Sequence, residues 1–164
     1  MNNQEVLLKE IDLIQACIKR MADNSFLLKG WTITILVAVL AFFAEKKDVY
    51  SISIILLIAT INFWYLDAFF LRAERMYRKL YEWVISNRMN TLDNAFDLNP
   101  NRFSNQVEKT FQIMISKTLR SFYGTLSALL FIFLIYKPIL FAINLTLKNK
   151  WCELLTFLVE KGGC

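Results

Sequence analysis

The chain has 164 residues, of which 56% are hydrophobic and 20% are charged, and its net charge is +5. Soluble domains are about 45–50% apolar and about 25% charged. Histidine, the residue most used as a general base and as a zinc or haem ligand, is absent. With only four glycines and two prolines, the composition disfavours a turn-rich β fold and a soluble enzyme. It favours an all-α helical membrane protein.

Residues 1–25 are predicted to form a cytoplasmic amphipathic helix. Its apolar positions alternate in spacings of four and three and form a seam: Leu7, Ile11, Ile14, Ile18 and Met21. The charged residues Lys9, Glu10, Asp12 and Lys19 fall off that seam. We expect the seam to pack against another cytoplasmic helix or a second copy of itself. Asp23-Asn24-Ser25 predicts a break or an N-cap before the next element.

Residues 26–71 are predicted to form a transmembrane helical hairpin. A spanning helix needs about 20 mostly apolar residues. Phe26–Ala44 and Val49–Leu71 meet this requirement, and each contains a single charged side chain inside its apolar run. Because only a few residues separate the two runs, we expect a tight turn between them.

A third transmembrane region is predicted within residues 120–147. Its apolar run, Ser121–Tyr136, is short and is expected to end at Lys137-Pro138. Residues 148–164 are interpreted as an amphipathic C-terminal tail. A fourth span over residues 139–158 is the alternative.

Basic residues are concentrated in residues 72–119, between the second and third apolar runs. The positive-inside rule places such segments in the cytoplasm. We therefore expect a multi-pass protein of the bacterial inner membrane with a cytoplasmic N-terminus and an external C-terminal tail, or a tail that folds back inside. Within this segment the pattern predicts a helix to residue 89, a loop over residues 90–102 and a helix over residues 103–119.

Lys29 and Asp67 are the two charges inside the predicted hairpin. Lys29 lies 18 residues before the centre of the turn, near residue 47, and Asp67 lies 20 residues after it. Both should therefore sit at a similar depth, near the cytoplasmic interface. An isolated charge at the bilayer centre costs about 2.5–3.5 kcal/mol on insertion scales. The placement predicts an intramembrane ion pair, with a role in an ion path or gate as the alternative.

Ser53, Thr60 and Asp67 are spaced by seven, which places them on one face of the second run. Thr34 lies on a small-residue face of the first run. These four residues are candidates for a pore or gate. Packing between helices is the alternative, since hydroxyl groups also hydrogen-bond across membrane helices. Such a thin polar stripe does not hold a water column in one chain, so a channel requires several copies.

Two further groups are expected to meet lipid. Aromatic residues predicted for the inner interface are Trp31, Trp64 and Tyr65, and a basic face follows the second run at Arg72, Arg75, Arg78 and Lys79. Binding of inner-leaflet lipid is the default interpretation of the basic face. An anionic ligand held in an oligomer is the alternative, as are pairs within the helix between Glu74 and Arg78 and between Lys79 and Glu82.

The sequence shows no catalytic set. We find no phosphate-binding loop, no nucleophile beside a base and no metal-ligand cluster, and Cys17, Cys152 and Cys164 have neither metal-site nor disulfide spacing. We therefore predict a protein that is not an enzyme and uses no cofactor.

The strings RMADNSFLLKGWTITI, FWYLDAFFLRAERMYRKLYEWV and SKTLRSFYG resemble small bacterial multi-pass membrane effectors of anti-phage defence operons, in particular the Hailong-type membrane effectors. The resemblance covers about residues 15–125. It implies an oligomer, with a tetramer as the first expectation, that perturbs the inner membrane on a signal from a nucleotide or oligonucleotide ligand or a nucleotide-making partner protein. The matching candidate positions are Lys29, Trp31, Asp67, Arg72 and Arg75. Unlike those effectors, this sequence shows no recognisable ligand-binding domain.

Overall fold

A computed structural model of the protein describes residues 3–43 and 49–161. The regular elements of this part are all helical: α1 (Asn3–Phe43), α2 (Val49–Asn87), the 3-10 helix η1 (Pro100–Gln106), α3 (Thr110–Met114) and α4 (Lys117–Lys161). Three helical stretches within it are long and apolar enough to cross a membrane: Asn3–Phe42, Ser51–Asn87 and Lys117–Tyr136. The all-α class is confirmed, and these helices support the prediction of a membrane protein.

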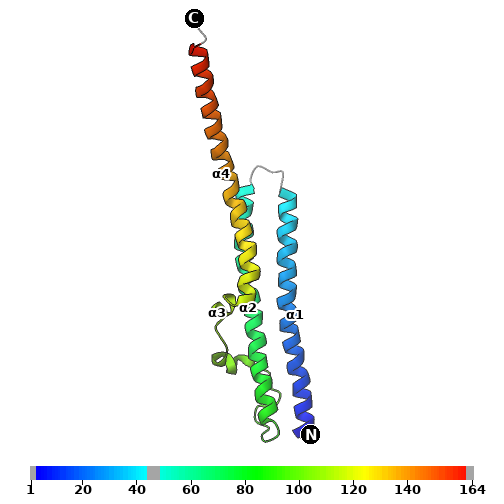
Figure 1. Ribbon diagram of the computed structural model, residues 1–164. Helices are drawn as coiled ribbons and strands as arrows, with labels where there is room; N and C mark the ends of the chain where they lie inside the picture. Colours follow the sequence, from blue (N-terminus) through cyan, green and yellow to red (C-terminus); the bar gives the residue numbers. More distant parts are fainter. Residues whose placement is uncertain (1–2, 44–48, 162–164) are drawn as a thin grey trace.

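Helices α1 and α2 pack side by side in antiparallel directions (Figure 1). At one end, the side chain of Asn3 donates to the main-chain carbonyl of Met89 at 3.3 Å. Near the other end, Leu36 packs with Leu56. The predicted turn falls on residues 44–48, which lie outside the described residues. The structure therefore describes the antiparallel packing of the two predicted helices but not the turn between them.

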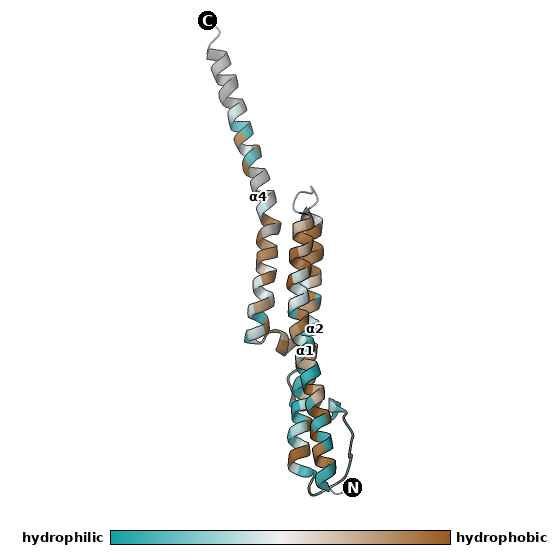
Figure 2. Ribbon diagram, turned by 90° about the vertical axis from the view of Figure 1, so that its right-hand side faces the viewer, coloured by the Kyte–Doolittle hydropathy of each residue, from teal (hydrophilic) through white to brown (hydrophobic). Residues whose placement is uncertain are grey.

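Polarity divides the bundle into two halves along its axis (Figure 2). The C-terminal half of α1, the N-terminal half of α2 and the first part of α4 form the apolar half. The N-terminal half of α1 and the C-terminal half of α2 form the polar half, together with the segment that follows α2. The polar half has its own core of Ile14, Leu80, Val84 and Phe103, with Leu7 and Ile18 packed against it. The predicted N-terminal seam thus packs on another helix, which is α2.

Helix α1 runs without interruption through Asp23-Asn24-Ser25, so the break predicted there is wrong. Ser25 is buried, and its hydroxyl donates to Asp67 of α2. Ser25 and Thr32 continue the seven-residue spacing that passes through Ile18. The face of α1 that contacts α2 therefore continues from the polar half into the apolar half. A break at Ser25 would interrupt this contact.

The connecting segment, residues 88–116, runs back along α2 and differs in part from the prediction. The expected loop over residues 90–102 is confirmed as far as Asn99, where η1 begins after an Asn99 side-chain cap. The expected continuous helix over residues 103–119 is wrong. Phe103 of η1 and Ile113 of α3 are both buried against α2. The backbone between these two helices is extended at Val107 and at Lys109.

Helix α4 continues through Lys137-Pro138 to Lys161, and within the described residues its candidate membrane span ends at Tyr136, where the predicted apolar run ends. A proline in a helix interior costs about 3 kcal/mol, and the remaining hydrogen bonds of a 45-residue helix outweigh that loss. The two apolar pieces on either side of Lys148–Lys150 belong to one helix. Its C-terminal part extends beyond the ends of α1 and α2 (Figure 1).

Candidate functional site

The two charges predicted to lie inside the hairpin, Lys29 of α1 and Asp67 of α2, are in contact. Nζ of Lys29 lies 2.7 Å from Oδ2 of Asp67. The side chain of Asp67 is 0% exposed, whereas that of Lys29 is 26% exposed. The predicted ion pair is therefore present, and it joins a buried carboxylate to a cation at the edge of the helix pair.

A serine hydroxyl bridges this pair. Ser25 donates to Oδ1 of Asp67 at 2.5 Å and accepts from Nζ of Lys29 at 2.9 Å. Ser25 stands one helical turn before Lys29, so both side chains reach the carboxylate from the same face of α1. A buried carboxylate is costly unless it is paired and hydrogen-bonded. The two α1 side chains together compensate the charge of Asp67.

Helix α4 contributes Tyr123 to the same place. Its side chain is fully buried, and its hydroxyl lies beside the Asp67 carboxylate and the Thr32 hydroxyl. No hydrogen bond of normal geometry reaches that hydroxyl from the part of the chain that the structure describes. The ring stacks on Trp64, with centroids 5.9 Å apart. We call Ser25, Lys29, Thr32, Asp67 and Tyr123 the polar cluster, and it joins all three long helices.

The stripe of Ser53, Thr60 and Asp67 faces the interior of the bundle, as its spacing predicts, and all three side chains are buried. Thr60 donates to the main-chain carbonyl of Leu56 at 2.8 Å, so its hydroxyl is satisfied within α2. The stripe is packed against neighbouring helices in this structure. Its interpretation as a pore lining stays a prediction.

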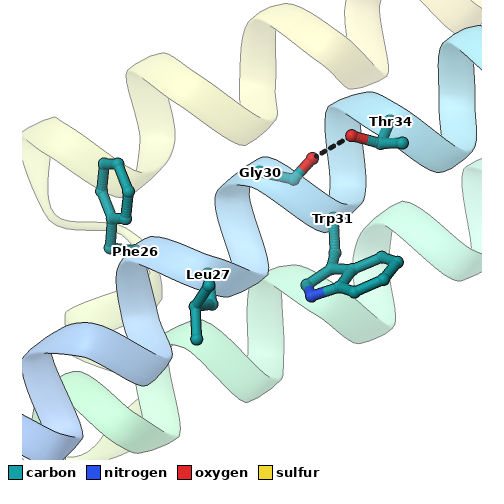
Figure 3. A pocket seen from close by; sticks show the side chains of 5 residues that line it. All are labelled: Phe26, Leu27, Gly30, Trp31 and Thr34. Carbon is teal, nitrogen blue, oxygen red and sulfur yellow. Dashed lines mark hydrogen bonds between the residues drawn. The ribbon is translucent and has the colours of Figure 1, made fainter.

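Thr34, the other pore or gate candidate, does not join the stripe. It is exposed, and it donates to the main-chain carbonyl of Gly30 at 3.0 Å. Figure 3 shows it in a shallow apolar hollow on the outside of α1, together with Phe26 and Trp31. The buried threonine of α1 is Thr32 instead. The seven-residue step from Ser25 to Thr32 repeats the spacing of the α2 stripe and could have identified it.

The three interface aromatics have different surroundings. Trp64 is partly buried and donates from Nε1 to the main-chain carbonyl of Met114 at 2.9 Å. Trp31 and Tyr65 are exposed on the outside of α1 and α2. Exposure of these two rings is what an interfacial aromatic belt requires, and their position at the interface stays a prediction.

The first two cations of the basic face hold the connecting segment. Arg72 donates to the main-chain carbonyls of Glu108, at 3.2 Å, and Ser104, at 3.3 Å. Arg75 pairs with the carboxylate of Glu108 at 2.9 Å. Sequence spacing places these arginines on one face of α2, but their partners lie more than 30 residues away and depend on the course of the connecting segment.

The other two cations make the pairs predicted within α2. Arg78 lies 2.6 Å from the carboxylate of Glu74, and Lys79 lies 2.7 Å from that of Glu82. Neighbouring carboxylates therefore offset much of the positive charge of the basic face. An anion that binds there has to compete with these carboxylates.

A second buried ion pair, between Glu10 and Arg88, was not predicted. Their side chains are 1% and 0% exposed, and the Arg88 guanidinium contacts both carboxylate oxygens of Glu10. Arg88 also donates to the main-chain carbonyls of Thr91, at 3.1 Å, and Asp93, at 2.9 Å. Glu10 accepts from the main-chain N–H of Phe96 at 2.6 Å. This pair fixes the start of the connecting segment to α1.

The interpretation of Glu10 as a residue off the helix contact was wrong. The antiparallel register set by the Lys29–Asp67 contact could have predicted the pairing of Glu10 with Arg88. Nineteen residues before Lys29 is Glu10, and nineteen residues after Asp67 is residue 86, two positions from Arg88. Opposite charges at the same level of two antiparallel helices predict a pair.

No protein-family model, no curated protein and no solved structure matches the chain. In the described residues, no group of three or more histidine, cysteine or acidic side chains is placed to hold a metal ion. The polar cluster is therefore the candidate functional site.

Proposed function

We propose that the chain is a subunit of a homo-oligomeric channel in the bacterial inner membrane, with the polar cluster as its gate. The supporting observation is the buried Asp67 carboxylate, with its Lys29 and Ser25 partners, inside helices apolar enough to span a membrane. Ionisable groups inside membrane helices are expensive and usually mark ion paths, proton relays or ligand sites. The positive-inside pattern supports the inner membrane and a cytoplasmic N-terminus.

The described structure corresponds to a closed state in this proposal. Lys29 neutralises the charge of Asp67, Ser25 donates a hydrogen bond to it, and the other stripe residues are covered by neighbouring helices. Opening separates α1 or α4 from α2 and exposes the Asp67 carboxylate to water, where it attracts cations. Several copies arranged around a common axis then place Ser53 and Thr60 along the path.

The trigger acts through the connecting segment. Arg72 and Arg75 hold this segment, which leads through α3 directly into α4. An anionic ligand of the nucleotide type that competes with Glu108 for Arg75 would release it. A role in anti-phage defence is supported by the sequence resemblance alone.

A non-conducting membrane anchor that recruits a soluble partner is the second candidate. The polar half of the bundle favours it, because this half has its own core and the buried Glu10–Arg88 pair. Such a half is a rigid platform that needs no movement to present a surface.

Potassium flux from proteoliposomes separates the two candidates. Lys29→Met leaves the Asp67 carboxylate without its cation, and we expect it to leak at least tenfold faster than the wild-type protein, since about 1.4 kcal/mol of lost closed-state preference is a tenfold change. Lys19→Gln removes an exposed cation of the polar half and should leave flux unchanged. Vesicles that stay tight with a folded Lys29→Met variant would contradict the channel and favour the anchor.

A further inference from the structure

Helix α3 and its C-cap residue carry apolar side chains on two opposite sides. Ile113 is buried against Ala68 of α2, whereas Phe111 is 70% exposed and Ile115 is 53% exposed. Neighbouring exposed apolar side chains are typical of a surface that contacts another protein or a membrane. One face of α3 is covered by α2, and the opposite face is open in the described part of the chain.

The position of α3 along the bundle is set by two contacts with α2. The carbonyl of Met114 accepts from Trp64, and Ile113 packs on Ala68. Both α2 residues lie inside the predicted span, which ends at Leu71. Trp64 is seven residues inside that end, a distance of about 10 Å along a helix. The level of α3 is therefore that of the predicted inner interface.

The backbone between α3 and α4 is suited to a poorly hydrated place. The N–H of Ser116 donates to the carbonyl of Ile113 at 3.0 Å, and the carbonyl of Ser116 accepts from the N–H of Arg120 at 2.9 Å. The carbonyl of Met114 accepts a hydrogen bond from Nε1 of Trp64. Non-helical backbone is tolerated at membrane depth only where such groups are satisfied by protein or by a wet cavity.

Basic side chains flank the exposed apolar face. Lys109 precedes α3, and Lys117 and Arg120 begin α4, and all three are exposed. Long basic side chains keep an apolar stem in the interface while their charge reaches the headgroups. Anionic lipid headgroups of the cytoplasmic leaflet attract cations in this position.

From this depth, apolar exposure and charge we propose that Phe111 and Ile115 insert into the inner leaflet, and that Lys117 and Arg120 bind its anionic headgroups. The segment of residues 109–120 is then a membrane-surface contact rather than part of a cytoplasmic platform. The proposal rests on the membrane placement proposed above. Because this segment leads into α4, the lipid surface acts on the helix that carries Tyr123.

Site-directed spin labels in lipid vesicles test the insertion. Each label is placed on a single cysteine, at Phe111→Cys or Ile115→Cys, in a chain whose Cys17, Cys152 and Cys164 are replaced by serine. Two matched positions calibrate the readout: Ile58→Cys on the outside of α2 and Asn105→Cys in η1, which are both exposed. Collision rates with oxygen, which enters lipid, and with a water-soluble nickel complex report the depth of each label.

We expect labels at 111 and 115 to collide more with oxygen than with nickel, as the label at 58 does, and the label at 105 to show the reverse. If labels at 111 and 115 report water while that at 58 reports lipid, the insertion is wrong and the membrane placement stands. If the label at 58 also reports water, both are wrong.

The headgroup contact has a separate test. In vesicles with phosphatidylglycerol, Lys117→Gln/Arg120→Gln should shift the label at 111 toward water. The matched variant Lys19→Gln/Arg20→Gln, which removes two exposed cations of the polar half, should not. The role of the basic residues would be overturned if the label at 111 had the same depth in both variants and in vesicles with and without phosphatidylglycerol.

Discussion

In the described residues, one ion pair joins α1 to α2 and another joins α1 to the start of the connecting segment, and the two are built differently. Arg88 and Glu10 are both completely enclosed, and the arginine also binds main-chain carbonyls of the connecting segment. Lys29 is partly exposed, and its partner Asp67 also binds a serine hydroxyl and lies beside a tyrosine hydroxyl that has no hydrogen bond within the described residues. A bidentate guanidinium fixes one geometry, whereas an ammonium on a flexible stem tolerates several.

The proposed gate assigns the two pairs different roles. In that proposal the Glu10–Arg88 pair is a static connection, and the polar cluster is a contact that forms and breaks.

The largest effect is expected from Arg88→Met, which leaves the Glu10 carboxylate buried without a cation. Removing one partner of a buried pair costs about 3–5 kcal/mol. The free energy of unfolding, measured by SDS titration in mixed micelles, should fall by this amount. Glu10→Gln/Arg88→Met should recover part of it, because no uncompensated charge remains. A change below about 1 kcal/mol in the single variant would contradict a static connection.

A matched pair of hydroxyl deletions distinguishes two hydroxyl groups of the polar cluster. Ser25→Ala removes the bridge between Lys29 and Asp67 and should cost about 1.5–3 kcal/mol, the range for a hydrogen bond to a charged group. Tyr123→Phe removes a hydroxyl without a normal hydrogen bond and should change stability by less than about 0.5 kcal/mol. The same SDS titration measures both variants. Equal losses would show that Tyr123 already belongs to the hydrogen-bond network.

The smallest effect concerns Arg75 and Glu108. The pKa of Glu108 is lowered by its own main-chain N–H and then by Arg75. A carboxyl group with a lowered folded pKa contributes stability above its unfolded pKa, and that contribution is lost as the pH falls through the folded value. The protection of the main-chain amides of residues 104–108 from hydrogen exchange should therefore fall under acidic conditions, compared with the protection of the amides of α2. In Glu108→Gln this extra acid sensitivity should disappear, and a profile identical to wild type would contradict the assignment.

Much of the fold follows from the sequence because its signals are local. Apolar run lengths give the three long helices, and a spacing of seven gives the buried stripe of Ser53, Thr60 and Asp67. The Lys29–Asp67 contact follows from counting residues on either side of one turn. Ser25 and Thr32 follow the same spacing, but polar residues ahead of an apolar run also signal an N-cap, so Asp23-Asn24-Ser25 predicts a helix break instead.

The remaining features depend on contacts between distant residues. The helical pattern alone predicts a surface position for Glu10, because its partner Arg88 lies 78 residues away in the sequence. The partners of Arg72, and the breaks on either side of α3, depend on the path of the connecting segment. The continuation of α4 through Pro138 depends on the length of the whole helix, which a local rule for proline does not include.

The most direct test of the gate is to restore charge neutrality in the leaking variant. Lys29→Met/Asp67→Asn carries no uncompensated carboxylate, so we expect potassium flux from its proteoliposomes to return to the low wild-type rate while Lys29→Met alone leaks. Flux that stays high in the double variant, or that never rises in the single one, would contradict a channel held closed by this pair.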